Sequence, residues 1–596
     1  MNAPGSMNQW VILQIPMAEH SPGRDTPGDV RAASCRAAGA GEAFSPLAGI
    51  VCLALALRAL AWLYGDPVTF DSALYFEMAD HIRAGRWAAL LGYEYPPLYP
   101  LLIAALQSLS LGADTVGLAL ACIADLLVLV PLVAITRRAA GEAAALGAAF
   151  LWATHLSAIR LGAQALTDAP TAFLVATALW VGLRAAEQDR WIGALAAGLA
   201  GGAAYLVRPE GLEPALALAA FYALLPAHRG TSGAGTASAA RRRAPWAWRK
   251  AVYVVALLAG WALVASPYVA WISLESGALT LSKKKSASSF VRSLAQVPGE
   301  GPLQQRQEPP GQPGQDARRQ PPAGGGETGG VATGPPSPPP QQSPRGSDGA
   351  EPSPGPRWLL GMGRSLYTFQ VPLVNGMSPL VLVFGCLGMF SLRARDSQGD
   401  RRVQALLGCL MVLHLAILVG LAADKGAAYL GGHHFFLLVL YALPFAGAGL
   451  AGVLGWLAGR WPGRWWVPAI LPGLIVGGTA ALLVTRGPDL GVSLRPAASW
   501  IRAQGIEHPV ILTNLAKLTF HARAERVEFR GTFEEVLRRM RARPVHFVAF
   551  YPNLVPGDFA DTFSRLRRDA LELAKVFPEP TRRAPDQRLE VYRLRP

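Results

Sequence analysis

About 11 apolar runs of near-spanning length constrain this chain more than any other feature. They lie roughly at 47–64, 115–135, 139–156, 169–187, 191–207, 212–226, 251–273, 378–393, 403–421, 435–455 and 465–485. Hydrophobic residues make up 51% of the 596 residues and charged residues only 16%, against roughly 25% charged in soluble domains. This composition excludes a soluble enzyme. The predicted fold class is a multi-pass α-helical membrane protein with about 11 spans.

The basic residues between the runs predict the orientation. A shorter run at 97–110 suits an interfacial or re-entrant segment better than a span. If this run does not cross and the N-terminus is cytoplasmic, the loops richest in Arg and Lys, among them 227–250, face the cytoplasm. We therefore expect a plasma (inner) membrane protein with an extracytoplasmic C-terminal domain. The net charge of +15 is then a topology signal, and nucleic acid is not an expected partner.

Shifts in composition divide the chain into segments. Residues 1–44 are polar, lack the pattern of a secretory signal, and are expected to form a disordered cytoplasmic N-terminus. The membrane core is expected in two parts, 45–297 and 357–486. Between them, residues 298–356 are rich in Pro, Gly and Gln, which predicts a disordered insert in an outer loop.

Residues 487–596 have a different character from the membrane core. Strand patterns lie at 510–513, 546–550 and 589–592, and helical periodicity lies at 532–542 and 557–574. This predicts a small α/β domain, and no catalytic signature is recognisable in it.

The first outer loop, 65–113, holds the most unusual residues. Around Leu74, Tyr75, Met78 and Ile82 the spacing predicts an amphipathic helix along the membrane surface. Asp71 falls at the start of this helix. It is either a functional carboxylate or simply the N-cap residue, because Asp is favoured at that position.

Three ionisable residues, Arg58, Asp125 and His414, lie inside apolar runs, where charge is costly and side chains usually face protein. Asp125 is near mid-span, so we expect a structural hydrogen-bonding role for it. The run Lys283-Lys284-Lys285 either attracts anionic lipid or is simply solvated. The five cysteines show no spacing for zinc or for a disulfide framework.

Five short motifs occur in order along the chain. They are Asp71-Ser72-Ala73-Leu74-Tyr75 with Ala79, Tyr93-Glu94-Tyr95-Pro96-Pro97-Leu98-Tyr99-Pro100, Leu166-Thr167-Asp168-Ala169-Pro170, Val207-Arg208-Pro209-Glu210-Gly211 and His433-His434-Phe435. With the α/β tail they resemble the GT-C glycosyltransferases, in particular the dolichyl-phosphate-mannose protein mannosyltransferases and the bacterial lipid A aminoarabinose transferase. The resemblance covers roughly 47–596 apart from the insert.

The resemblance implies an activity on the extracytoplasmic face. A sugar would pass, with inversion, from a polyprenyl-phosphate donor to a lipid, a cell-envelope glycan or a protein. Asp71 would be the general base for the acceptor hydroxyl. Arg208 would meet the donor phosphate, since a guanidinium suits phosphate oxygens. His433 and His434 replace a basic-aromatic pair of the family and are candidates for the same phosphate.

Glu94, Tyr95, Tyr99 and Asp168 complete the candidate substrate-binding residues. Asp168 has the alternative of capping a helix before Pro170, Arg208 that of an interfacial anchor, and the two histidines that of a structural role.

The chain departs from the family pattern at two positions. Ser72 stands where the family often has a second acid, and Tyr95 stands where a basic residue often precedes the paired prolines. No metal ligand is therefore assigned, although a divalent cation stays open. Two other functions also stay open: a polytopic transporter or lipid flippase, and a non-catalytic protein of the GT-C fold.

Overall fold

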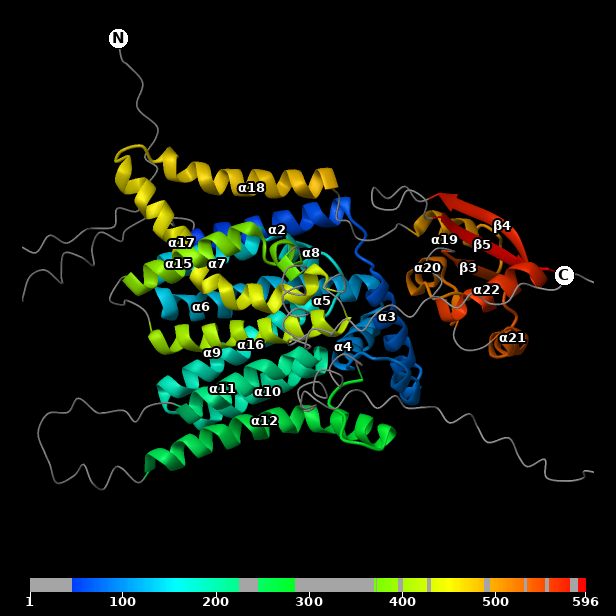
Figure 1. The fold of residues 1–596 in the computed structure, drawn as a ribbon, viewed down its shortest axis with the longest axis horizontal. Coiled ribbons are helices and arrows are strands. Elements are labelled where there is room, and N and C mark those ends of the chain that lie inside the picture. The colour runs from blue at the N-terminus through cyan, green and yellow to red at the C-terminus, as the bar shows by residue number, and fades with distance from the viewer. Residues whose placement is uncertain are drawn as a thin grey trace, which may run out of the picture.

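The computed structural model of the chain consists of a helical bundle with a small α/β domain at one end (Figure 1). It describes residues 45–224, 245–283, 369–370, 372–394, 400–425, 430–486, 494–529, 533–551, 557–578 and 588–595. The predicted disordered segments 1–44 and 298–356, and Lys284 and Lys285, lie outside these ranges.

Among the described residues, each apolar run predicted from the sequence coincides with one helix or with consecutive helices of the bundle. These are α2 (Pro46–Tyr64), α5 (Ala113–Leu127), α6 (Leu129–Ala140), α7 (Glu142–Thr154), α8 (Leu156–Gly162), α9 (Asp168–Gln188), α10 (Trp191–Val207), α11 (Glu213–Leu224), α12 (Pro245–Ser276), α15 (Pro379–Ala394), α16 (Arg401–Lys425), α17 (Phe436–Arg460) and α18 (Trp466–Arg486). Within the described ranges, seven helical segments are long and apolar enough to cross a membrane, and α7 with α8 forms a bent pair at 63° that could be an eighth. The multi-pass helical class is confirmed, and the number of about 11 spans stays a prediction.

Small residues let neighbouring helices of the bundle approach closely. A Cβ atom on Gly198 of α10 would collide with the Leu257 carbonyl of α12, and one on Gly388 of α15 would collide with the Phe445 carbonyl of α17. Glycine at these positions therefore allows backbone contact, as is common between helices in membranes.

The ionisable residues inside the apolar runs are paired within the bundle. Arg58 Nε of α2 lies 2.6 Å from Asp125 Oδ2 of α5, and both side chains are almost fully buried. Nδ1 of His414 lies 2.8 Å from Glu213 Oε1, also in the interior. These contacts agree with the predicted structural role of Asp125 and with the expectation that such charges face protein.

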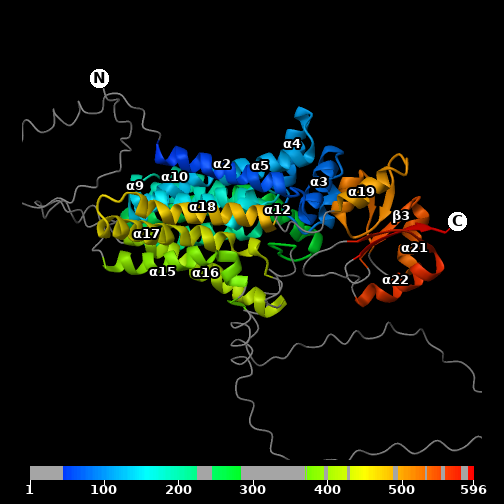
Figure 2. The same ribbon diagram turned by 90° about the horizontal axis from the view of Figure 1, so that it is seen from above.

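The first outer loop forms a layer at the end of the bundle that carries the α/β domain (Figure 2). It contains α3 (Phe70–Arg83), η1 (Trp87–Gly92), α4 (Leu98–Leu106) and η2 (Gln107–Leu109). The segment 97–110 is thus a short helix with one extra turn, which agrees with the prediction that it is too short for a span.

The predicted amphipathic helix is α3, but it is buried more completely than a surface helix. Tyr75 and Met78 of the predicted apolar face are buried, and Leu74 and Ile82 are partly buried. Phe76, outside that face, is also buried. Helix α20 (Ala516–Ala522) of the α/β domain packs against α3 and covers Phe76, and α4 and α5 also pack against α3.

A mixed five-stranded sheet forms the centre of the α/β domain. Its elements are α19 (Arg495–Arg502), β1 (Val510–Leu512), α20 (Ala516–Ala522), β2 (Glu525–Val527), α21 (Phe533–Ala542), β3 (Phe547–Phe550), α22 (Gly557–Asp569), β4 (Leu571–Pro578) and β5 (Arg588–Leu594). The strand order is β2-β1-β3-β5-β4; β1 is parallel to β2 and β3, and β5 is antiparallel to β3 and β4. The three predicted strands are confirmed as β1, β3 and β5.

One predicted helix of this domain extends too far. The helix expected over 557–574 ends at Asp569, and the chain continues at Leu571 as the edge strand β4. The strand β4 is extended because it pairs with β5 along most of its length. Local periodicity in the sequence does not report such tertiary pairing. Hydrophobic clusters lie on both faces of the sheet, one under α21 and α22 and the other under α19 and α20.

Two sets of contacts fix the α/β domain onto the first outer loop. Phe520 of α20 stacks on Phe76 of α3 with ring centroids 4.9 Å apart. Asp66, just before α3, lies 2.9 Å from Lys517 Nζ and 3.5 Å from His521 Nε2. The start of α3 is therefore held between the bundle and the α/β domain.

Candidate active site

Thr69 and Ser72 define the start of α3 and the position of Asp71. The Thr69 side chain accepts a hydrogen bond from the Ser72 backbone N–H, and the Ser72 hydroxyl accepts one from the Thr69 backbone N–H, which completes a capping box. The N-cap is thus Thr69, and the alternative that Asp71 caps the helix is wrong. Asp71 lies in the first turn, where the helix dipole favours a carboxylate.

The Asp71 side chain is half-buried and held at one oxygen. The Tyr95 hydroxyl donates to Asp71 Oδ1 over 2.8 Å. No described residue donates a side-chain or backbone hydrogen bond to the other oxygen, Oδ2. The carboxylate is therefore oriented and retains an acceptor for a further proton donor.

Three tyrosine rings pack beside Asp71. Tyr75 meets Tyr95 and Tyr99 edge to face, with centroids 5.0 and 5.3 Å apart. Burial, and then the negative charge of Asp71, raises the pKa of Tyr95 far above its usual value, so its hydroxyl stays a donor. Tyr99 is fully buried and donates to the Gly117 carbonyl oxygen over 2.8 Å. Tyr99 therefore supports the cluster from beneath.

Arg208 lies in a buried cluster of opposite charges at the same end of the bundle. Its Nη1 donates to Asp168 Oδ1 over 2.7 Å, and its Nε lies 3.5 Å from Glu210 Oε2. The guanidinium also lies over the Phe436 ring, 5.5 Å from the centroid. Arg208 is only 7% exposed, so the alternative of an anchor that extends to the lipid headgroups does not apply.

Burial opposes the charge of Arg208, but Asp168 and Glu210 outweigh it and raise the pKa of the guanidinium above its usual value. Its Nη2 group donates to no described residue. Asp168 is the first residue of α9, and Thr167 occupies the N-cap position. The structure gives Asp168 the role of counter-ion to Arg208.

Tyr75 connects the carboxylate with the arginine cluster. Its hydroxyl lies 3.2 Å from Thr167 Oγ1, directly before Asp168. Burial raises the pKa of Tyr75, the charge of Asp71 raises it further, and Arg208 lowers it, so Tyr75 lies within electrostatic range of both groups. The structure therefore brings the predicted base and the predicted phosphate-binding cation to one place.

The twin histidines open α17 beside this cluster. His433 and His434 lie in the short helix η5 (Gly432–Phe435), with ring centroids 4.0 Å apart. His434 Nδ1 accepts from the Gly431 backbone N–H, and its carbonyl lies 3.0 Å from His414 Nε2. His434 thus fixes the local backbone, and the exposed His433 packs against its ring.

A pocket of about 390 Å³ opens beside Tyr95 between the first outer loop and the α/β domain. Its lining residues are Phe70, Leu74, Gly92, Tyr93, Glu94, Tyr95, Asn514, Arg526 and Glu528. Tyr95 links this pocket to the carboxylate, and the predicted residue Glu94 is exposed on its wall.

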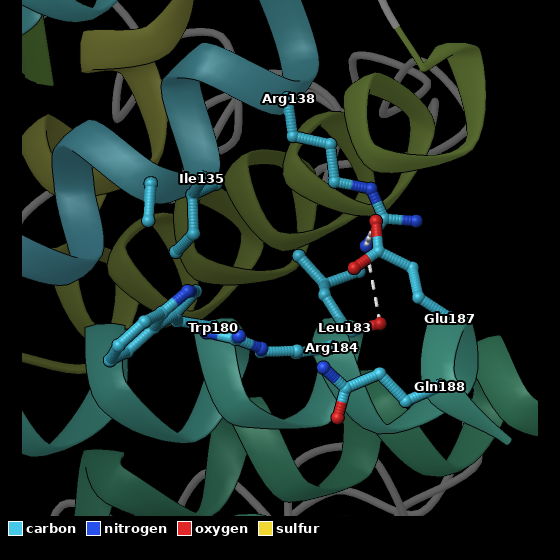
Figure 3. Close-up of a pocket in the computed structure, with 8 residues that line it drawn as sticks. Ile135, Arg138, Trp180, Leu183, Arg184, Glu187 and Gln188 are labelled. Carbon is cyan, nitrogen blue, oxygen red and sulfur yellow. Dashed lines mark hydrogen bonds and ion pairs between the residues drawn. The ribbon is translucent and has the colours of Figure 1, made fainter. Parts of the chain in front are cut away.

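A second pocket of about 290 Å³ lies away from these residues, where α6 meets α9 (Figure 3). Arg138 crosses it, with Nη1 3.0 Å from Glu187 Oε1 and 3.1 Å from the Leu183 carbonyl oxygen. None of the predicted site residues lines this pocket.

Several residues of the site were not singled out from the sequence. Glu210 belongs to the fourth of the five motifs, but no local sequence pattern indicates that it faces Arg208. Asn514 and Arg526 lie in a domain without a catalytic signature, and only tertiary packing brings them to the first outer loop. In the described part of the chain, no three His, Cys, Asp or Glu side chains are grouped so that they could hold a metal ion.

Comparisons with known proteins give the family context. Residues 94–271 match the family model described as dolichyl-phosphate-mannose-protein mannosyltransferase. The crystal structure of ArnT from Cupriavidus metallidurans bound to undecaprenyl phosphate matches with a TM-score of 0.51 and 13% identity, covering 92% of this chain and 98% of that one. Its apo structure matches with a TM-score of 0.50 and 13% identity, over 91% and 98%.

The oligosaccharyltransferase of Archaeoglobus fulgidus, in complex with Zn and sulfate, matches with a TM-score of 0.47 and 13% identity, over 87% of this chain and 69% of that one. No curated protein sequence matches this chain. The chain is therefore similar to the protein mannosyltransferases over residues 94–271 and to ArnT in its fold.

Proposed function

We propose that the chain is an inverting membrane glycosyltransferase that takes a sugar from a polyprenyl-phosphate donor, with Asp71 as general base. The single observation that carries this proposal is the state of the Asp71 carboxylate. It is half-buried, oriented through Oδ1 by Tyr95, and open at Oδ2 among the described residues. A positioned carboxylate of this kind is suited to take a proton from an acceptor hydroxyl.

The acceptor side of the reaction centres on Oδ2 of Asp71. The acceptor hydroxyl donates its proton to this oxygen while its own oxygen forms a bond to the anomeric carbon of the donor sugar. The bond between that carbon and the phosphate oxygen breaks on the opposite face, which inverts the configuration. The phosphate leaves as an anion and needs no proton, so one carboxylate suffices.

The donor side depends on Arg208. Asp168 and Glu210 hold the guanidinium in place, and Nη2 remains for a phosphate oxygen. Negative charge grows on the phosphate as the sugar leaves, and a fixed cation stabilises that charge without reorganisation. His433 is a second candidate contact, since it is exposed and packs on His434, which lies within electrostatic range of Arg208.

The likeness to ArnT supports a polyprenyl carrier, because that relative has been solved with undecaprenyl phosphate bound. The match of residues 94–271 to the protein mannosyltransferase model supports sugar transfer. The distribution of basic loops supports an extracytoplasmic site in the plasma (inner) membrane, with a cytoplasmic N-terminus. The acceptor is proposed as a lipid, a cell-envelope glycan or a protein.

The test is sugar transfer from undecaprenyl-phosphate sugars by the purified full chain. Asp71→Asn keeps the shape of the side chain and removes the base, so we expect kcat to fall by about 10²- to 10⁴-fold. The matched control is Asp80→Asn on the same helix, where the carboxylate is exposed, and it should leave kcat unchanged.

Full turnover by Asp71→Asn would remove Asp71 as the base. Movement of the intact donor across a vesicle membrane without sugar transfer would instead support a transporter or flippase. Both results would contradict the proposal.

A further inference from the structure

The pocket between the first outer loop and the α/β domain has a lining that defines a ligand class. It reaches Asp71 through Tyr95, which lines the pocket and donates its hydroxyl to Asp71 Oδ1. If the chain is the glycosyltransferase proposed above, a molecule in this pocket would present its hydroxyl groups to the base. The residues that line the pocket therefore indicate the chemical class of the acceptor.

Aromatic rings form one part of the lining. Phe70 is 47% exposed, and Tyr93 and Tyr95 are half-buried. Rings that are partly exposed at a pocket offer flat apolar faces. A sugar ring carries C–H groups on its faces and hydroxyls around its edge, so flat rings match its faces.

Hydrogen-bonding groups form the other part. Asn514 Oδ1 accepts from the Phe529 backbone N–H over 3.0 Å, which leaves the Asn514 amide N–H groups for a ligand. Glu94 adds carboxylate acceptors from the other side. Hydroxyl groups both donate and accept, and they can satisfy both kinds of group at once.

Arg526 is a further donor, and ion pairs with two glutamates hold its side chain in the pocket wall. Its side chain is 6% exposed, and Nη2 lies 2.7 Å from Glu77 Oε2 and 2.9 Å from Glu528 Oε1. Nε is buried with no hydrogen-bond partner, and Nη1 donates to no described residue. An unsatisfied guanidinium in a pocket wall favours a ligand that brings an acceptor oxygen.

The charge balance excludes one class of acceptor. Glu94 and Glu528 line the pocket, and Arg526, the one cation among its lining residues, is already paired with Glu528 and with Glu77 behind it. A net negative surface repels a phosphate- or carboxylate-bearing headgroup. We infer that this pocket binds a neutral saccharide, and that the acceptor of the proposed reaction is the hydroxyl of an uncharged glycan.

Binding is tested first, without any donor, on the full chain in lipid–detergent micelles. The probes are mannotriose, maltotriose and arabinotriose as neutral saccharides, glucose 1-phosphate as an anionic sugar, and a hexapeptide with Ser and Thr. We expect the best trisaccharide to bind at least about tenfold more tightly than glucose 1-phosphate.

Two conservative variants test the lining. Glu94→Gln removes a carboxylate acceptor, and Asn514→Asp keeps the oxygen that holds Phe529 while removing the amide donors. Each should weaken trisaccharide binding by about tenfold. Glu572→Gln, on an exposed position of β4, is the matched control and should not change it.

Three outcomes overturn the inference: trisaccharide affinity equal in all variants, tighter binding of glucose 1-phosphate, or hexapeptide binding that the pocket variants abolish.

A failure of the saccharide site can be distinguished from a failure of the proposed function. Asp71→Asn should abolish transfer and keep trisaccharide binding. Pocket-dependent binding without transfer by the wild type would refute only the glycosyltransferase, and transfer to a peptide unaffected by the pocket variants would refute only the saccharide site.

Discussion

Tyr95 donates its hydroxyl to Asp71 Oδ1 over 2.8 Å, and this bond joins the two outer-loop segments that carry the candidate site. The family resemblance leads one to expect a basic residue at position 95, and the structure gives the tyrosine there a different task. It orients the carboxylate and also lines the adjoining pocket. The departure at this position is therefore compatible with an intact site.

Tyr95→Phe should lower kcat by about tenfold or more, because a hydrogen bond to a charged group contributes about 1.5–3 kcal/mol. The ring and its packing on Tyr75 remain, so donor KM should change little. Steady-state kinetics measures both. Tyr253→Phe is the matched control, since it removes another tyrosine–aspartate bond, to Asp189 over 3.0 Å, far from the site in sequence and fold. Equal losses in both variants would argue against a special role of Tyr95.

Asp168→Asn should destabilise the protein, since Arg208 is then left buried without its nearest counter-ion. Breaking a buried ion pair at one partner costs about 3–5 kcal/mol. Thermal unfolding in detergent measures the loss. Glu142→Gln is the control, because its ion pair with Arg137 is more than half exposed on both sides and such pairs contribute little.

Arg208→Lys separates charge from geometry in the same cluster. Lysine keeps the positive charge beside Asp168 and loses the planar fork that suits phosphate oxygens. We expect a small loss of thermal stability and a large loss of donor affinity, visible as a raised donor KM. An unchanged donor KM would remove Arg208 from the phosphate site.

The sequence predicts the parts of the site that depend on local order. The five motifs locate Asp71, Tyr95, Asp168 and Arg208, and the structure brings these four together through Tyr75. The N-cap role of Thr69 was not predicted, because Ser72 stands where the capping-box signature has Glu or Gln. Ser72 is fully buried in that box, which gives this departure from the family pattern a structural reason.

Tertiary packing decides what the sequence does not predict. Arg58 and Asp125 lie in separate apolar runs, and only the contact of α2 with α5 shows that they form a pair. The strand β4 carries helical periodicity and is extended because β5 pairs with it. The pocket beside Tyr95 combines residues more than 400 positions apart, such as Tyr95 itself and Arg526.

Acid should weaken the docking of the α/β domain on the first outer loop. Burial opposes ionisation of Asp66, but contacts with His521 and Lys517 outweigh it, and the pKa of this carboxyl lies below its usual range. A lowered pKa in the folded state adds stability above the unfolded value of about 4, and this stability is lost as the pH falls further. Hydrogen exchange of α20 should thus be slow at neutral pH and faster below about pH 4.

Asp66→Asn should remove this pH dependence and give fast exchange of α20 already at neutral pH. Glu142→Gln again serves as the control and should exchange like the wild type. If α20 of Asp66→Asn remained protected at neutral pH, the ion cluster would not be what fixes the domain.

Phe520→Ala should lower kcat although Phe520 belongs to the α/β domain. Its ring stacks on Phe76 of the helix that carries Asp71, with centroids 4.9 Å apart. An aromatic pair contributes about 0.5–1.5 kcal/mol beyond the buried area. If that energy holds α3 in its active position, kcat should fall between about twofold and tenfold. Phe520→Leu keeps much of the apolar contact and should recover part of the rate. The same kcat for all three proteins would mean that the bundle alone positions Asp71 and that the α/β domain serves only to bind the acceptor.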